Sequence, residues 1–178
     1  MRKWVIIVLT VALLAAVGVI GWQMFKPSDE PVHKGKTMTS WLRERRNNGV
    51  NSAETIQQAE QALRDIGTNS IPTLLALLRA TNSPLKLKLM RLAQRQRVIK
   101  IHIEDAGDLN SLAMDGFHVL GTNGQAAVPA LIEIVNEDFS EVSQIYAVWS
   151  LGDIGPSAKP IVPLLLSWAT NAYELQWR

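Results

Sequence analysis

Two stretches of the chain repeat one pattern: SLGDIGPSAKPIVPLL at Ser150–Leu165 and GFHVLGTNGQAAVPAL at Gly116–Leu131. In both, a helical stretch ends in leucine or isoleucine, and a glycine, a short polar turn, an aliphatic–proline pair and a second apolar helix follow. The interval from Gly121 to Gly155 equals the interval between the prolines that open the second helix, Pro129 and Pro163. Because two independent markers share one period, these stretches are internal repeats.

A shorter copy lies nearer the N-terminus, where Ala62–Leu75 reads ALRDIGTNSIPTLL. The interval from Gly67 of this copy to Gly121 is longer than the period, which places an insertion between the first two copies. Glycine adopts the left-handed backbone that ends a helix, and proline in a first helical turn removes an N–H group that has no partner there. Each copy is therefore predicted to be a pair of helices joined by a glycine-closed turn.

The helices of these pairs are predicted to be amphipathic. The apolar faces consist of Ile145, Val148, Trp149 and Leu151 in one helix and of Leu164, Leu165 and Trp168 in its partner. We expect Trp149 and Trp168 to be buried, and Trp41 to pack the first helix, capped by Thr37, against the rest. A two-helix unit cannot bury both apolar faces alone, so the units must stack. No alternating Val, Ile and Thr run between hairpin turns occurs, so no sheet is expected.

These repeats resemble those of the HEAT-repeat family. The matching segments are Leu151–Pro156, Ala158–Lys159, Val162–Leu165, Gly121 and Ala126–Leu131. The segment with Gly35–Lys36 and Trp41–Leu42 is similar to the lead-in of exported HEAT-repeat proteins of environmental bacteria. The resemblance implies an all-α fold, a right-handed α-solenoid of stacked helical hairpins over residues 37–178, and no particular chemistry. Since residues 172–177 resemble the start of another repeat, we expect the array to continue beyond Arg178, and a last helix that caps the array is the alternative.

A membrane segment is predicted before the repeats. Trp4–Phe25 form an unbroken stretch without a charge, long enough to cross a bilayer, because about 20 helical residues span a hydrocarbon core. We predict a transmembrane or signal helix over residues 1–25 and an exposed linker over residues 26–36. The length favours an uncleaved signal anchor, and cleavage at Ala16–Gly18 with secretion is the alternative. A short N-terminal tail before a long C-terminal domain favours export, so we expect the repeats outside the cytoplasm, for example in the periplasm.

No pattern in the sequence is typical of an active site or a metal site. The chain has no cysteine, no H-E-x-x-H motif and no G-x-S-x-G motif, and it lacks the histidine–glutamate pairs that bind iron in HEAT-like hydroxylases. We interpret His118 as a packed or surface histidine and the acidic residues near Asp108 and Asp115 as a solvated surface. We therefore expect no catalytic residue, cofactor, metal ion or small-molecule substrate.

The charge is distributed unevenly along the chain. Residues 34–100 hold 13 Lys/Arg and 4 Asp/Glu, a net charge of +9, whereas residues 101–178 hold 2 and 10, a net charge of −8. The cations concentrate in the insertion Pro84–Lys100. On a helix, Lys88, Arg91 and Arg95 share one face, and Leu85, Leu89, Leu92 and Ala93 share another.

Three interpretations of the basic face remain open. It is a solvated face or complements the charge of a neighbouring repeat, it binds anionic lipid or an acidic protein, or it binds nucleic acid. The acidic second half and the export signal disfavour nucleic acid. We expect a non-enzymatic scaffold that presents its helical surface to a protein partner at or outside the membrane. The alternative is an electrostatic binder of anionic lipid or nucleic acid through residues 84–100, with Lys88, Arg91 and Arg95 as its contacts.

Overall fold

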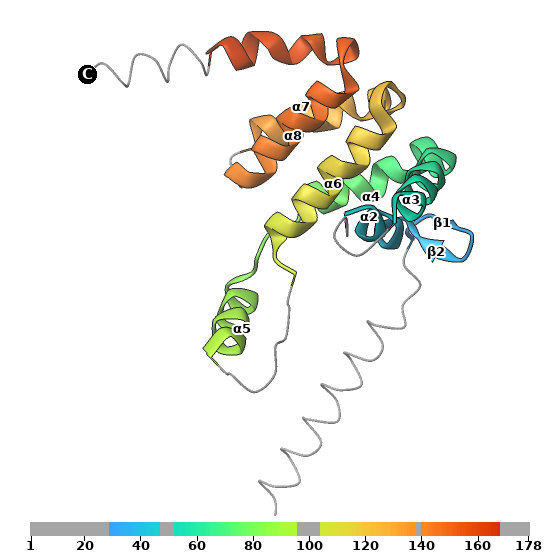
Figure 1. Ribbon diagram of the computed structural model, residues 1–178. Coiled ribbons are helices and arrows are strands. Elements are labelled where there is room, and N and C mark those ends of the chain that lie inside the picture. The colour runs from blue at the N-terminus through green and yellow to red at the C-terminus, as the bar shows by residue number, and fades with distance from the viewer. Residues whose placement is uncertain (1–28, 47–51, 96–103, 138–139, 168–178) are drawn as a thin grey trace, which may run out of the picture.

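The computed structural model describes residues 29–46, 52–95, 104–137 and 140–167, and these residues are mostly helical, as predicted (Figure 1). The predicted membrane segment lies outside the described residues, as do residues 26–28 of the predicted linker and Trp168. Among the helices that are described, none is long and apolar enough to cross a membrane.

The helices follow the repeat pattern that the sequence predicts. They are α2 (Met38–Arg46), α3 (Ala53–Ile66), α4 (Ile71–Leu78), α5 (Pro84–Arg95), α6 (Ala106–Leu120), α7 (Val128–Asn136) and α8 (Glu141–Ile154), and residues 162–167 are also helical. Each glycine-containing turn is a short 3-10 helix, at Gly67–Ser70, Gly121–Ala127 and Pro156–Ile161. Thr37 caps α2 as predicted, because its Oγ1 accepts a hydrogen bond from the Ser40 backbone N–H at 3.3 Å.

The expectation of no sheet is wrong in one small segment. Strands β1 (Val32–His33) and β2 (Lys36–Thr37) form an antiparallel hairpin in the predicted linker. The turn residues Lys34 and Gly35 both have positive φ, 49° and 76°, as a two-residue hairpin turn requires. The Trp41 indole N–H donates to the His33 carbonyl at 3.1 Å, and the Lys36 ammonium lies 4.4 Å from the Trp41 ring centroid. Two such short strands are too brief to show the alternation by which a strand is recognised in a sequence.

The repeated glycines end their helices with positive φ, as predicted. Gly67, Gly121 and Gly155 have φ of 58°, 52° and 80°, and each N–H donates to a carbonyl in the last turn of the preceding helix. Their ψ values of −137°, −130° and −134° are extended, so the backbone leaves the helix in a conformation that is almost restricted to glycine. Pro72 and Pro129 lie in the first turn of the helices that follow, also as predicted.

The helices that pack as hairpins are not the expected pairs. We expected a pair on either side of each glycine, but extensive packing joins α4 with α6 and α7 with α8. In both hairpins, the start of the second helix lies beside the end of the first: Asn110 binds carbonyls at the end of α4, and Gln144 binds carbonyls at the end of α7. Since α2 also packs extensively with α3, the turns at Gly67 and Gly121 instead connect one hairpin to the next. The basic insertion, α5, is therefore inserted between the two helices of the α4–α6 hairpin.

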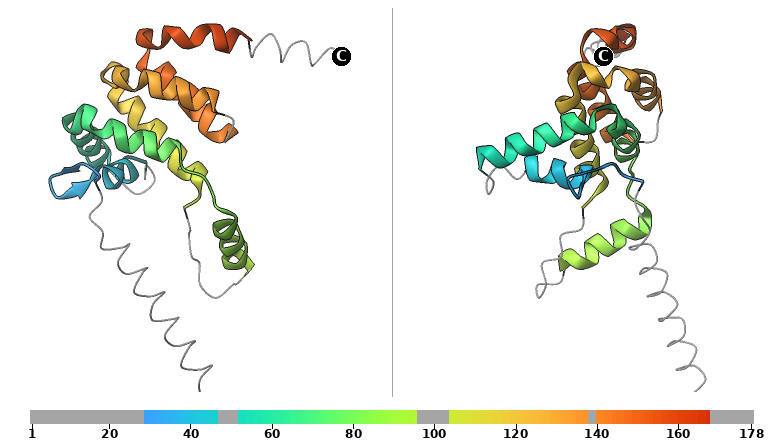
Figure 2. Two further views of the ribbon diagram at one scale, coloured as in Figure 1. Left: turned by 180° about the vertical axis from the view of Figure 1, so that it is seen from behind. Right: turned by 90° about the vertical axis from the view of Figure 1, so that its right-hand side faces the viewer.

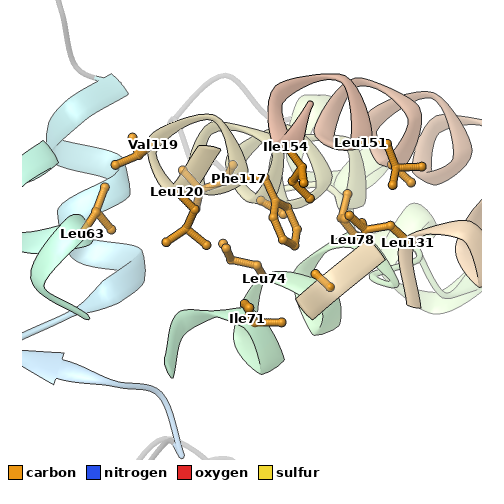
Figure 3. Packing of buried hydrophobic residues seen from close by; sticks show 14 of the residues in the cluster. Leu63, Ile71, Leu74, Leu78, Phe117, Val119, Leu120, Leu131, Leu151 and Ile154 are labelled. Atoms are coloured by element: carbon orange, nitrogen blue, oxygen red, sulfur yellow. The ribbon is translucent and has the colours of Figure 1, made fainter. Parts of the chain in front are cut away.

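Large hydrophobic side chains fill the core (Figure 3). Small side chains between them allow the helices to approach closely. A Cβ atom at Gly116 of α6 would lie 2.4 Å from Leu74 Cδ2 of α4, so a larger residue there would require the Leu74 side chain to shift. The residues at the same repeat position, Ala62 and Ser150, are small and buried. Phe117 and Ile154 fill the space between the hairpins, both with no exposed surface. Trp41 is buried as predicted, at 6% exposed.

The prediction that Trp149 is buried is wrong. Trp149 is 56% exposed and Ile145 is 45% exposed, whereas Ala147 and Leu151 of the same helix are buried. Helix α8 is apolar on both sides, so the periodicity of its sequence does not identify which side faces the core. The side with small residues faces the core because it permits close helix packing.

Candidate interaction surfaces

Much of the basic first half of the chain is neutralised within the fold. Arg43 of α2 donates from Nε and Nη2 to the two carboxylate oxygens of Glu104, at 2.9 and 2.8 Å. Hydrogen bonding to Glu104 raises the pKa of Arg43 above its ordinary value, although partial burial opposes the shift. The arginine is therefore charged throughout the physiological pH range, and the bidentate geometry favours this pairing over a single contact.

The other two arginines at the end of α2 converge on one carboxylate of α6. Arg46 donates to Asp115 Oδ2 at 3.0 and 2.8 Å and to Ser111 Oγ at 2.8 Å. Arg45 lies 3.5 Å from Asp115 Oδ1 and 3.1 Å from Glu60 of α3. Asp115 is only 19% exposed, so solvent screens these pairs less than it would on an open surface. The acidic residues that we interpreted as a solvated surface thus include the partner that fixes α2 to α6.

Arg79 and His118 contact carboxylates of the next hairpin. Arg79, just after α4, lies 2.8 Å from Glu133 and 3.4 Å from Glu137, at the C-terminal end of α7. His118 Nδ1 lies 2.9 Å from Asp153 Oδ1, which places this histidine at the surface in an α6–α8 contact. Arg79 and the arginines of α2 therefore complement carboxylates of other helices, although the three interpretations concern the basic face of the insertion and not these residues.

The predicted contact residues of the basic insertion differ from these arginines. Lys88 and Arg91 are exposed on α5. Arg95 is the last residue of that helix, and the Arg95 side chain is not among those that the structure describes. No carboxylate of a described residue lies within ion-pair distance of Lys86, Lys88 or Arg91. Among the described residues, the Arg91 Nε donates only to the backbone carbonyl of Leu87, at 3.4 Å. Figures 1 and 2 show α5 standing apart from the other helices, and no other described element packs extensively on it.

A cluster of amide side chains closes the base of this insertion. The Asn110 Nδ2 donates to the carbonyls of Leu77, Leu78 and Ala80 at 2.9, 2.8 and 3.3 Å, and Asn110 is 1% exposed. Asn82 Oδ1 accepts a hydrogen bond from the Ala106 N–H at 2.9 Å, so the two ends of the insertion are held together.

The amide cluster was missed in the sequence, although a signal was present. Gln144 follows Asn110 by the same interval that separates Gly155 from Gly121. Its Nε2 donates to the carbonyls of Val135 and Glu137 at 3.0 and 2.9 Å. An amide at the same repeat position thus caps the end of the preceding helix in both hairpins. Amide side chains suit this role because one NH₂ group supplies two donors to helix-end carbonyls that otherwise lack partners.

A second exposed surface lies on α8 and was also missed. Val142, Ile145 and Trp149 occupy positions i, i+3 and i+7 and are 45%, 45% and 56% exposed. The Tyr146 and Trp149 rings meet edge to face, with centroids 5.6 Å apart. We call Val142, Ile145 and Trp149 the α8 stripe. Large apolar side chains aligned on a solvent-facing helix side are typical of a binding surface.

The part of the chain that the structure describes offers no group of three His, Cys, Asp or Glu side chains placed to hold a metal ion. Of the two histidines in the described ranges, His33 lies 3.5 Å from Asp65 and His118 lies beside Asp153. Comparison of the chain with protein-family models, with curated proteins and with solved structures finds no match.

Proposed function

We propose that this chain is a non-enzymatic scaffold of the HEAT-repeat type, held at the membrane by residues 1–25 with its repeats outside the cytoplasm. The regular internal period, the glycine–proline turns and the two successive hairpins α4–α6 and α7–α8 support the solenoid assignment. Ion pairs between the hairpins make the stack rigid, as a surface that displays a binding site requires. The scaffold binds a protein partner through the α8 stripe.

The exposure of Trp149 is the observation that carries this proposal. Tryptophan is enriched among the residues that dominate protein interfaces, where truncating one costs about 2 kcal/mol or more. Val142 and Ile145 extend the same surface along almost two helical turns. Burying three large apolar side chains in a partner removes them from water, which supplies the main driving force for association.

The charges near the α8 stripe favour a protein over a lipid surface. Glu141 begins α8 and is exposed, and Asp153 lies near its other end. An anionic membrane surface would repel carboxylates placed beside the apolar residues. The complementary occupant is an apolar segment of a protein with neutral or basic flanking residues.

Site-specific photo-cross-linking of the full chain in its own membranes tests the proposal. A photoreactive amino acid replaces Ile145, and the matched control carries it at Gln57, an exposed position on α3. We expect a single adduct from position 145 and none of that mass from position 57. The partner identified in that adduct is then purified and titrated with the chain, where Trp149→Ala should weaken binding by about 30-fold, the equivalent of about 2 kcal/mol.

Three outcomes would overturn the proposal. They are the absence of any adduct from position 145, an adduct that Trp149→Ala leaves unchanged, and an adduct with twice the mass of the chain. The last outcome would show that the α8 stripe joins two copies of the chain rather than a different protein.

A further inference from the structure

The unpaired cations of the described residues gather on α5. Five Lys or Arg side chains have no carboxylate of a described residue within ion-pair distance, and they are Lys34, Lys86, Lys88, Arg91 and Lys159. Three of these five lie within two turns of one helix. Between positions 84 and 95 the sequence contains four Lys or Arg, including Arg95, and no Asp or Glu. This helix therefore concentrates positive charge that no carboxylate of the described residues pairs.

The same helix has an apolar residue that the fold leaves exposed. Four of its 12 residues are leucines, and Leu87 is 42% exposed. No other described element packs extensively on α5, and the insertion is tied to the body at its base through Asn82 and Asn110. An isolated helix of about 12 residues is only marginally stable in water, so its folding requires an apolar surface from outside the repeats.

We propose that α5 lies on the anionic phospholipid surface of the membrane to which the chain is anchored. Lys86, Lys88 and Arg91 then contact headgroup phosphates, and the apolar positions of the helix enter the boundary between headgroups and acyl chains. This inference rests on the proposed membrane anchor, which holds α5 close to a lipid surface. A single hydrophobic anchor leaves the repeats free to reorient, and a second contact through α5 fixes how the scaffold faces the bilayer.

Lipid explains both properties of α5 better than nucleic acid does. Binding to nucleic acid requires clustered cations, but it does not explain why four of the 12 residues of α5 are leucines. The interface of an anionic bilayer accepts cations and apolar side chains together, and this combination on one short helix is typical of interfacial helices.

The absence of native cysteine permits a direct test in the full chain. Leu87→Cys is labelled with a fluorophore that reports the polarity of its surroundings, and the protein is reconstituted into nanodiscs. One set contains only phosphatidylcholine, and the other also contains phosphatidylglycerol. We expect a blue shift of the emission with the anionic lipid alone, while the same label on Gln57→Cys, on α3, does not respond.

Charge variants show whether the cations cause this response. The triple variant Lys86→Gln, Lys88→Gln, Arg91→Gln should lose the response to anionic lipid, because each charge contributes about fivefold to the docking equilibrium and three contribute about 100-fold. The matched control, Lys34→Gln with Lys159→Gln, removes unpaired cations outside α5 and should keep the response. Far-UV circular dichroism of both variants verifies that the repeats remain folded.

Several results would overturn the inference. They are a label at position 87 that ignores lipid composition, a triple variant that keeps the full response, and a response to single-stranded RNA in place of anionic lipid. An error in the proposed membrane anchor, residues 1–25, would give a different result. Alkaline carbonate would then extract the chain from its membranes, while the label at position 87 would still respond to anionic vesicles. Failure of partner binding is recognised by the cross-link at position 145, which does not depend on α5.

Discussion

Replacing Asn110 by alanine should destabilise the α4–α6 hairpin, because this side chain binds buried carbonyls at the end of α4. The Asn110 NH₂ group is the buried donor that closes the end of α4, at 2.8 Å from the Leu78 carbonyl and 3.3 Å from that of Ala80. The Leu77 carbonyl keeps another partner, the Ala80 N–H at 3.2 Å. In the alanine variant, the Leu78 carbonyl therefore lacks its donor while its residue remains completely buried.

The magnitude follows from the number of groups that lose a partner. One buried carbonyl without a hydrogen bond costs about 1–3 kcal/mol. The amide oxygen of Asn110 has no hydrogen-bond partner among the described residues, so its removal breaks no further bond. We therefore expect Asn110→Ala to lower the free energy of unfolding by about 2 kcal/mol. Asn110→Asp should lower it further, since a carboxylate would face carbonyl oxygens at a site that is 1% exposed.

Urea unfolding of the full chain in a mild detergent, followed by far-UV circular dichroism, measures these differences. Gln144→Ala, the repeat equivalent in a half-buried position, should cost about 1 kcal/mol. The control is Asn136→Ala, which removes an exposed amide bonded within its own helix and should change stability by less than about 0.5 kcal/mol. If Asn110→Ala is as stable as Asn136→Ala, the amide does not close the hairpin and the reasoning is refuted.

Four other substitutions test three separate features of the fold. Gly121→Ala should destabilise the chain by about 1–3 kcal/mol because of the backbone conformation at Gly121. Gly152→Ala lies inside α8, with no atom within 4 Å of the new Cβ, and should stabilise the chain by about 0.4–1 kcal/mol. Equal effects of the two substitutions in urea melts would contradict the assigned turn. Asp115→Asn should lower the free energy of unfolding by about 1–2 kcal/mol. This loss should shrink at high salt, since the partners of Asp115 are the α2 arginines. A loss that is independent of salt would count against these ion pairs. Trp149→Ala should change the free energy of unfolding by less than about 1 kcal/mol because the side chain is exposed; a loss of about 3–5 kcal/mol would instead show a buried tryptophan.

The local features of the repeats could be predicted from the sequence. Gly67 and Gly121 end helices because the turn needs positive φ, and Pro72 and Pro129 open helices because no N–H partner is available there. These requirements concern one residue and its immediate backbone. They are therefore visible in a sequence without knowledge of which helices meet.

The features that depend on contacts between helices could not be predicted in this way. The repeat pattern shows where the helices lie but not which pairs form hairpins, because a glycine turn and a short polar loop both reverse or redirect the chain. Trp149 was placed on the wrong side of α8 since both sides are apolar. The pairing of Arg46 with Asp115 joins residues far apart in the sequence, and net charges over segments cannot show that opposite charges meet in the fold.

The uneven charge of the chain has two causes with different consequences. On α2, arginines occur in a helix that packs against α6, so their carboxylate partners are supplied by the fold and the pairs fix one helix to another. Helix α5 stands apart from the other helices (Figure 1), and its residues Lys88 and Arg91 remain exposed. A cluster of buried or paired charges would oppose binding to an anionic surface, because desolvation and loss of the partner would offset the new contacts. Among the described residues, Lys34, Lys159 and the cations of α5 are free of that cost, so the basic surface available for binding is much smaller than the net charge of +9 over residues 34–100 indicates.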